Sequence, residues 1–114
     1  MPHFVIDCSP SISSTVSPTD LIREVHIIAE ASGLFRTADI KVRIREYENY
    51  LVAGETADFI HVFASIMDGR TVAQKAELSK AVVTKLCTLF PDVTTVSMNV
   101  WEFENATYSN RNSI

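Results

Sequence analysis

The chain has 114 residues, of which 46% are hydrophobic and 21% are charged, and its formal net charge is −4. This length predicts one domain, over residues 1–114, with room for one core. The negative charge argues against a nucleic-acid or anionic-membrane partner, so an anion site has to be a local group of cations. No apolar run approaches the roughly 20 residues that cross a bilayer. No secretory pattern begins the chain, so a cytoplasmic protein is predicted.

The first half of the chain follows the order strand, helix, strand. Residues 3–8 are a short apolar run rich in β-formers and are predicted to be a strand. Residues 9–20 are predicted to be a polar loop that ends in a helix start, where Ser17 can cap the helix and a proline follows it. Gly33 is typical of the end of that helix. Residues 39–50 then alternate apolar and charged side chains, which predicts a second strand.

The second half repeats this plan. Residues 58–67 form a strongly apolar strand. Thr71 and Gln74 have the spacing of a capping box, which predicts a helix start, and Pro91 ends that helix. Residues 94–104 are predicted to be the last strand.

The two halves, about residues 2–52 and 57–104, therefore share the order βαβ. A right-handed crossover in each half places both helices on the same side of the sheet. We expect an α+β fold in which two βαβ repeats form a four-stranded sheet with two helices on one face. Ferredoxin-like domains, many of them dimeric regulators or binding modules, have the same element order, so the order alone leaves that alternative open.

The predicted sheet face opposite the helices mixes charged, polar and aromatic side chains. They alternate along each strand with the apolar residues that face the helices. This uncovered face consists of Lys41, Arg43, Arg45, His61, Phe63, Ser65, Ser97, Asn99 and Trp101. Such a face is typical of an oligomer that packs its sheets together, and exposure to solvent is the alternative.

No nucleotide loop, zinc spacing or nucleophile elbow occurs in the sequence, and no metal site is predicted. Cys8 and Cys87 match no metal spacing and are predicted to be buried free thiols. His61 is interpreted as a packed or interfacial residue. His3 lies beside Pro2, where it lines a site or ends a strand in solvent.

Pro2 allows two interpretations. Proline has no backbone N–H, and at the edge of a strand this does no harm. Alternatively, a small second residue permits the removal of Met1, and the new N-terminus is then a secondary amine on a rigid ring. Such an amine can act as a base.

Four stretches carry a resemblance to a known family: MPHFVIDCS, SGLFRTADIKVR, FIHVFASIMDGRT and the tail NRNSI. They resemble the 5-carboxymethyl-2-hydroxymuconate delta-isomerase family of the tautomerase superfamily, essentially along the whole chain. The resemblance implies a homotrimer whose sheets pack inward. It also implies an isomerase of aromatic compound catabolism that uses no cofactor. This enzyme shifts a proton in a small anionic substrate, an unsaturated 2-hydroxy di- or tricarboxylic acid.

The resemblance also implies roles for individual residues. Pro2 matches the amino-terminal base of the family, and Arg70 matches an arginine that binds the acid substrate. A second site arginine of the family follows the isoleucine of the ADI stretch, and here that position is Lys41. Lysine offers a point charge rather than a planar fork, so carboxylate binding is weakened or altered, and Arg43 on the same face is expected to compensate.

The implied chemistry suits these residue types. Removing a proton from an enol or an allylic carbon at neutral pH needs a base whose pKa lies near that pH. Burial and nearby cations lower the pKa of an amine, and the same cations stabilise dienolate charge. If Met1 is retained, the nitrogen of Pro2 is an amide and is not basic. The alternative function is therefore a non-catalytic trimeric tautomerase-like module for ligand binding or interaction.

Overall fold

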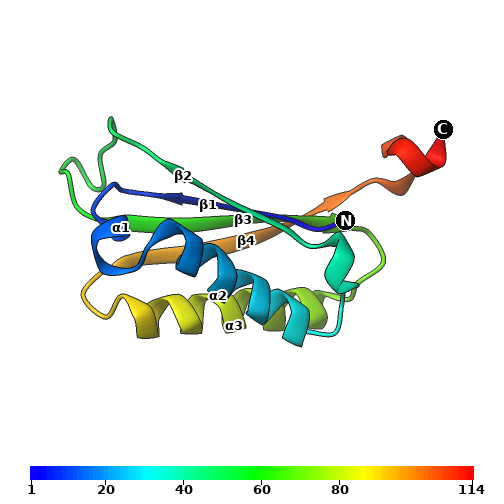
Figure 1. Cartoon of the computed structure of the whole chain (residues 1–114), viewed down its shortest axis with the longest axis horizontal. Helices are drawn as coiled ribbons and strands as arrows, with labels where there is room; N and C mark the ends of the chain where they lie inside the picture. Colours follow the sequence, from blue (N-terminus) through cyan, green and yellow to red (C-terminus); the bar gives the residue numbers. More distant parts are fainter.

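The computed structural model describes residues 1–114 and shows a four-stranded sheet with two long helices on one face (Figure 1). The strands are β1 (His3–Cys8), β2 (Lys41–Glu46), β3 (Phe59–Met67) and β4 (Thr95–Phe103). The long helices are α2 (Pro18–Ala31) and α3 (Val72–Leu89). The sheet order is β2-β1-β3-β4, with β1 parallel to β2, β3 parallel to β4, and β1 antiparallel to β3. The predicted α+β fold of two βαβ repeats is confirmed.

Helix α2 begins and ends at the predicted signals. The hydroxyl of Ser17 accepts a hydrogen bond from the N–H of Asp20 at 3.2 Å, which satisfies one of the free donors of the first turn. After the helix, Gly33 has a φ of 72°, a left-handed conformation that glycine adopts without a Cβ clash. The buried face of the helix consists of Leu21, Val25 and Ala29.

Helix α3 begins at the predicted capping box. The side chain of Thr71 accepts from the N–H of Gln74 at 3.1 Å, and the side chain of Gln74 accepts from the N–H of Thr71 at 2.8 Å. This reciprocal cap fixes the first turn of the helix and, with it, the position of Arg70 immediately before it. The buried face consists of Leu78, Val82 and Leu86.

The core lies between the helices and one face of the sheet. The fully buried strand residues are Phe4, Ile6, Cys8, Ile60, Val62, Ala64 and Ile66. On the opposite face, Phe63 is 38% exposed and Trp101 is 61% exposed. His61 is half-buried there, and its ring nitrogens lie 2.6 Å from Ser97 Oγ and 2.6 Å from Asn99 Oδ1. The predicted division of the sheet into an apolar and a mixed face is thus present.

Two local predictions were wrong. The polar loop contains a short helix, α1 (Ile12–Thr15), because Ile12 is buried and its N–H bonds to the carbonyl of Ser9 at 3.2 Å. Cys87 is exposed. It follows the buried Leu86 on α3, and one residue along a helix turns the side chain by about 100°, away from the core.

After β4 the chain continues into a tail with the short 3₁₀ helices η2 (Asn105–Thr107) and η3 (Arg111–Ser113). Figure 1 shows this tail projecting from the end of the sheet at which the N-terminus also lies. None of the helices has the length and apolar character that crossing a membrane requires.

The two thiols are expected to differ in reactivity. Burial raises the pKa of Cys8 to about 12, so its reactive thiolate is scarce, whereas Cys87 lies open to reagent. At about pH 8, a chromogenic disulfide reagent should label one thiol per chain quickly and the second only after unfolding. Cys87→Ser should abolish the fast phase. Two fast thiols in the native protein would contradict this placement.

Candidate functional site

The strand register brings three distant segments together at one end of the sheet. Because β1 is parallel to β2, His3 pairs with Lys41, and the carbonyl of Pro2 accepts a hydrogen bond from the N–H of Lys41 at 3.1 Å. Because β1 is antiparallel to β3, His3 also pairs with Ser65. The start of β1 therefore lies next to the end of β3, where the turn to α3 carries Arg70.

These segments enclose a cavity of about 210 Å³, here called the inner cavity. Its lining consists of Met1, Pro2, Leu34, Phe35, Arg36, Asp39, Met67 and Arg70. Pro2 itself is fully buried. The inner cavity thus combines the first residues of the chain with cations from two separate loops.

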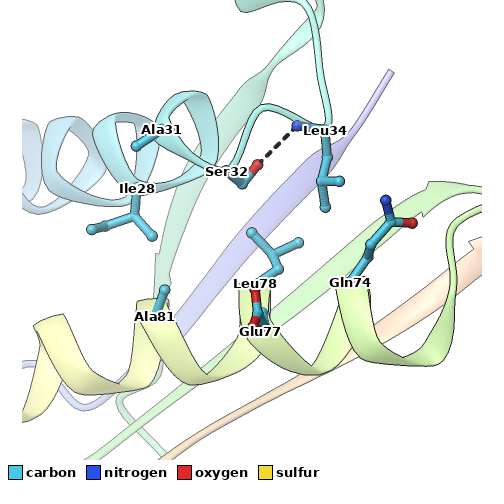
Figure 2. A pocket seen from close by; sticks show the side chains of 8 residues that line it. All are labelled: Ile28, Ala31, Ser32, Leu34, Gln74, Glu77, Leu78 and Ala81. Carbon is cyan, nitrogen blue, oxygen red and sulfur yellow. Dashed lines mark hydrogen bonds between the residues drawn. The ribbon is translucent and has the colours of Figure 1, made fainter.

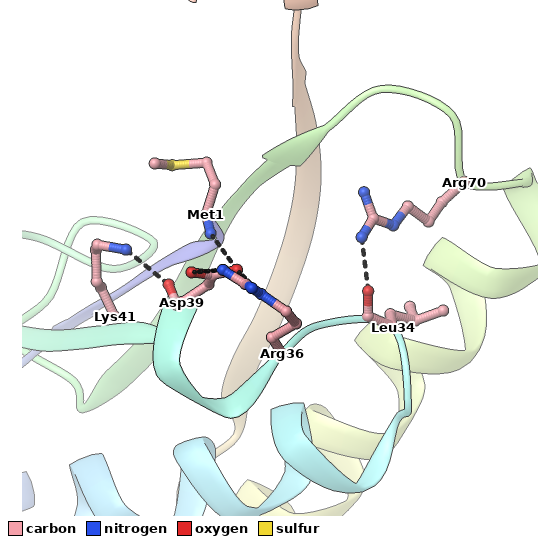
Figure 3. Close-up of polar contacts among 6 residues, drawn as sticks. All are labelled: Met1, Leu34, Arg36, Asp39, Lys41 and Arg70. Carbon is pink, nitrogen blue, oxygen red and sulfur yellow. Dashed lines mark hydrogen bonds and ion pairs between the residues drawn. The ribbon is translucent and has the colours of Figure 1, made fainter. Parts of the chain in front are cut away.

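Arg70 is held in place by two contacts with the segment that follows α2. Its Nη2 donates a hydrogen bond to the carbonyl of Leu34 at 2.6 Å (Figure 3). Its guanidinium carbon lies 5.3 Å from the centre of the Phe35 ring. A cation over an aromatic face is attracted by the ring's negative centre, so the two contacts together orient the guanidinium at the cavity. The donors not used by Leu34 are available to an anion.

Asp39 supplies the carboxylate of the inner cavity. Arg36 donates to it from Nε at 3.0 Å and from Nη2 at 3.2 Å, and the Met1 amine lies 3.8 Å from Oδ2 (Figure 3). Lys41 Nζ donates to the backbone carbonyl of Asp39 at 2.7 Å. The hydrogen bond from Arg36 is the main reason that the pKa of Asp39 lies below its ordinary value. Asp39 is therefore a carboxylate at neutral pH.

The amine at the N-terminus has a pKa below its ordinary value. Burial is the largest cause, and the positive charges of Lys41, Arg36 and Arg70 act in the same direction. Asp39 opposes them by stabilising the protonated form. An amine in this environment loses its proton more readily than one in water.

A second space, of about 390 Å³, adjoins the first and is called the outer cavity. The two cavities share Met1, Arg36, Asp39 and Met67. The outer cavity is completed by Lys41 and by residues of the tail, namely Tyr108, Asn110, Arg111 and Asn112.

The four site residues predicted from the sequence lie in three different places. Pro2 and Arg70 line the inner cavity, and Lys41 lines the outer one. Arg43 lines neither, because its Nη1 lies 3.0 Å from Nδ1 of His3 on the uncovered sheet face.

Sequence reasoning missed Arg36, Asp39 and Arg111 as residues of these cavities. The spacing of Arg36 and Asp39 by three positions in a short loop could have indicated an ion pair. No pattern in the sequence indicates that Arg111 in the tail lies next to the N-terminus.

A further cavity, of about 370 Å³, lies between α2 and α3 and differs in character (Figure 2). Its lining consists of Ile28, Ala31, Ser32, Leu34, Gln74, Glu77, Leu78 and Ala81. Glu77 is its one charged residue, so it offers no cation to an anionic ligand. The inner and outer cavities are the candidate site for an anion. No group of three or more His, Cys, Asp and Glu side chains is placed to hold a metal ion.

The sequence matches a known protein family. The family model of 5-carboxymethyl-2-hydroxymuconate isomerase matches residues 2–114. The chain is 27% identical over 79 residues to the 5-carboxymethyl-2-hydroxymuconate Delta-isomerase of Escherichia coli. This alignment covers 68% of the chain and 63% of that relative, a little under two thirds of the relative's length.

Solved structures with this fold include several tautomerase superfamily members. A 5-carboxymethyl-2-hydroxymuconate isomerase from Deinococcus radiodurans R1 superposes with a TM-score of 0.84 at 20% identity, covering 96% of this chain and 88% of that one. The W0 fused 4-OT wild-type symmetric trimer gives a TM-score of 0.82 at 15% identity, covering 98% and 96%. The macrophage migration inhibitory factor of Trichinella spiralis gives 0.77 at 10% identity, covering 96% of each chain. At these sequence identities, the structural similarity shows that the chain shares the fold of these proteins.

Proposed function

The chain belongs to the 5-carboxymethyl-2-hydroxymuconate isomerase family, and from this membership we propose a cofactor-free tautomerase. It shifts a proton in a small unsaturated 2-hydroxy acid that carries two or three carboxylates. Met1 is removed, the nitrogen of Pro2 is the base, and Arg70 binds the acid group. The observation that carries the proposal is the inner cavity, where Pro2 and Arg70 line the same space although they are far apart in the sequence.

The cavity favours a basic amine. Burial lowers the pKa of the amine of Met1, and Pro2 lies one residue deeper and is fully buried. The same physical cause therefore acts on the nitrogen of Pro2 once it becomes the N-terminus. We expect this environment to favour the unprotonated amine, and the pyrrolidine ring fixes the direction of its lone pair.

The reaction is a proton transfer through this one amine. The Pro2 nitrogen takes the 2-hydroxyl proton of the substrate, and negative charge spreads over the conjugated chain to the oxygen. The protonated amine then gives the proton to a carbon of the chain, which yields the conjugated ketone. Arg70 faces the cavity with its charge already oriented by Leu34 and Phe35, so it stabilises the dienolate without rearranging.

The uncovered sheet face supports a homotrimer. Phe63 and Trp101 are exposed on this face in the single chain, beside polar groups such as His61. Exposed apolar patches with a polar rim are typical of protein interfaces. The fused 4-OT neighbours are described as symmetric and asymmetric trimers, and they share this sheet architecture.

The alternative is a trimeric tautomerase-like module that binds a ligand without converting it. One observation favours it: with Met1 in place, its amine lies on Asp39 and its side chain lines both cavities. In that form the nitrogen of Pro2 is an amide. The state of Met1 therefore separates the two functions.

Light scattering at micromolar concentration is expected to give three times the mass of the chain. Trp101→Glu should shift the population towards monomer, because it places a charge on the face that the trimer buries. A matched change on an outer helix, Lys80→Glu, should leave the trimer intact. A monomeric wild-type protein would contradict the assembly.

The base is tested by comparing two forms of the chain, one released from a leader at Pro2 and one released at Met1. Intact mass identifies each form, and both should have the same circular dichroism. The form that begins with Pro2 should convert 2-hydroxymuconate and phenylenolpyruvate, whereas the form that keeps Met1 should be nearly inactive because its Pro2 nitrogen is not basic. Pro2→Ala keeps a primary amine in a looser geometry and should retain a small part of the rate. Equal rates of the two forms would remove Pro2 from the mechanism.

Arg70→Ala should lower kcat/KM by roughly 30- to 1000-fold, about 2–4 kcal/mol of transition-state binding. Arg70→Lys keeps the charge but loses the planar fork, so its rate should lie between those of wild type and Arg70→Ala. Arg23 on α2, which forms an ion pair with the surface residue Asp20, provides the control. Arg23→Ala should leave kcat/KM unchanged. An unchanged rate in Arg70→Ala would show that Arg70 does not act on the substrate.

A further inference from the structure

The cavity between α2 and α3, here called the helix cavity, lies apart from the candidate anion site. Its volume of about 370 Å³ falls within the range of small-molecule pockets, roughly 300–1,000 Å³. Leu34 is the one residue that it shares with the inner cavity. The two helices cover one face of the sheet (Figure 1), and Phe63 and Trp101 lie on the other. Assembly through the uncovered sheet face therefore leaves the helix cavity open to solvent.

Small side chains leave the seam between the two helices open at one end. At the other end, Lys85 Nζ lies 3.2 Å from Glu24 Oε2, and this ion pair bridges α2 and α3. Towards Leu34, the lining includes Ala31 on α2 and Ala81 on α3, whose side chains are single methyl groups. The apolar part of a ligand can therefore enter between the helices at this end.

The floor and the end wall of the helix cavity are apolar and held in place. Figure 2 shows Ile28, Leu34 and Leu78 pointing into the space between the helices. The N–H of Leu34 donates a hydrogen bond to Ser32 Oγ at 3.2 Å, and the carbonyl of Leu34 accepts one from Arg70 at 2.6 Å. A wall that is fixed on both sides does not have to be ordered when a ligand binds, which lowers the entropic cost of binding.

Glu77 gives the helix cavity an uncompensated negative charge. The hydroxyl of Ser32 donates to the carbonyl of Ala29 at 2.6 Å, and the side chain of Gln74 accepts from the N–H of Thr71 at 2.8 Å, so both of these polar side chains are used at helix ends. Glu77 belongs to none of the ion pairs of the chain, and no cationic side chain lines the cavity. A carboxylate at the edge of an apolar surface suits a ligand whose apolar body ends in a cation.

We propose that the helix cavity is a binding site for a small amphipathic amine. The apolar body packs on Ile28, Leu34 and Leu78, and the ammonium lies at Glu77. Burial of the apolar body supplies most of the affinity, because an ion pair at an exposed carboxylate such as Glu77 contributes little. Glu77 instead sets the preference for a cation. The site takes no part in the proton transfer, so the inference does not depend on the proposed function.

The test compares 4-phenylbutylamine with 4-phenylbutanol, which share one apolar body and end in an ammonium and in a hydroxyl. Titration calorimetry at neutral pH and low salt should give a dissociation constant roughly threefold lower for the amine, in keeping with an exposed ion pair. In Glu77→Gln the two ligands should bind about equally. The control Glu48→Gln removes the same charge from the loop after β2 and should keep the preference.

A second pair of variants tests the place of binding. Ala81→Phe fills the space between the helices and should weaken the binding of both ligands by about tenfold or more. Ala76→Phe makes the same change on the opposite side of α3 and should leave both dissociation constants unchanged. Both alanines are exposed, so the two variants should keep the circular dichroism of wild type.

The inference is overturned if neither ligand binds wild type, if the two phenylalanine variants weaken binding equally, or if Glu77→Gln still prefers the amine. Light scattering tests for another occupant. A lower particle mass for Ala81→Phe than for wild type and Ala76→Phe would show that a further copy of the chain covers the cavity, which also overturns the inference. If Ala81→Phe does not fold, the comparison of Glu77→Gln with Glu48→Gln still decides, because both changes lie at the surface.

Discussion

The pairing of β1 with both of its neighbours is the constraint on which the site depends. A central strand that is parallel to β2 and antiparallel to β3 has its first residue beside the start of one strand and the end of the other. The loop that leads into β2 and the turn that leaves β3 therefore meet at the N-terminus. A register shift of one residue would turn Phe4 and Ile6 out of the core, so the burial of these side chains also fixes the position of Pro2.

The groups around the N-terminus have opposing effects on the pKa of its amine, which suits a group that takes up and releases a proton. Burial and three cations favour the neutral amine, while Asp39 favours the protonated one. Arg36 in turn forms an ion pair with Asp39, which offsets part of its positive charge. The net effect is a pKa of the Met1 amine below its ordinary value.

The fold could be predicted from the sequence because its signals are local. Capping residues such as Ser17 and Thr71 accept hydrogen bonds from backbone N–H groups three positions later. Along β1 and β3, buried side chains alternate with exposed or partly exposed ones. The exceptions have local causes as well: α1 begins at a single buried residue, Ile12, inside a polar stretch, and one step of helical rotation exposes Cys87. The site was harder, because its residues meet through strand register. Pro2, Arg70 and Lys41 were identified through the family resemblance, whereas Arg111 reaches the outer cavity through the path of the tail, which no periodicity encodes.

The two interpretations of Pro2 have the same structural origin. At the start of β1 the residue's carbonyl accepts from Lys41, and no ladder bond requires its N–H, so a proline costs the sheet nothing there. The position that tolerates a missing N–H also lines the inner cavity, and no strand neighbour needs its nitrogen. A base at the end of the chain needs that freedom, since its lone pair has to point at a ligand. A proline just before a strand and a catalytic proline are therefore compatible demands on one position, and burial of its ring disfavours the protonated form of an amine there.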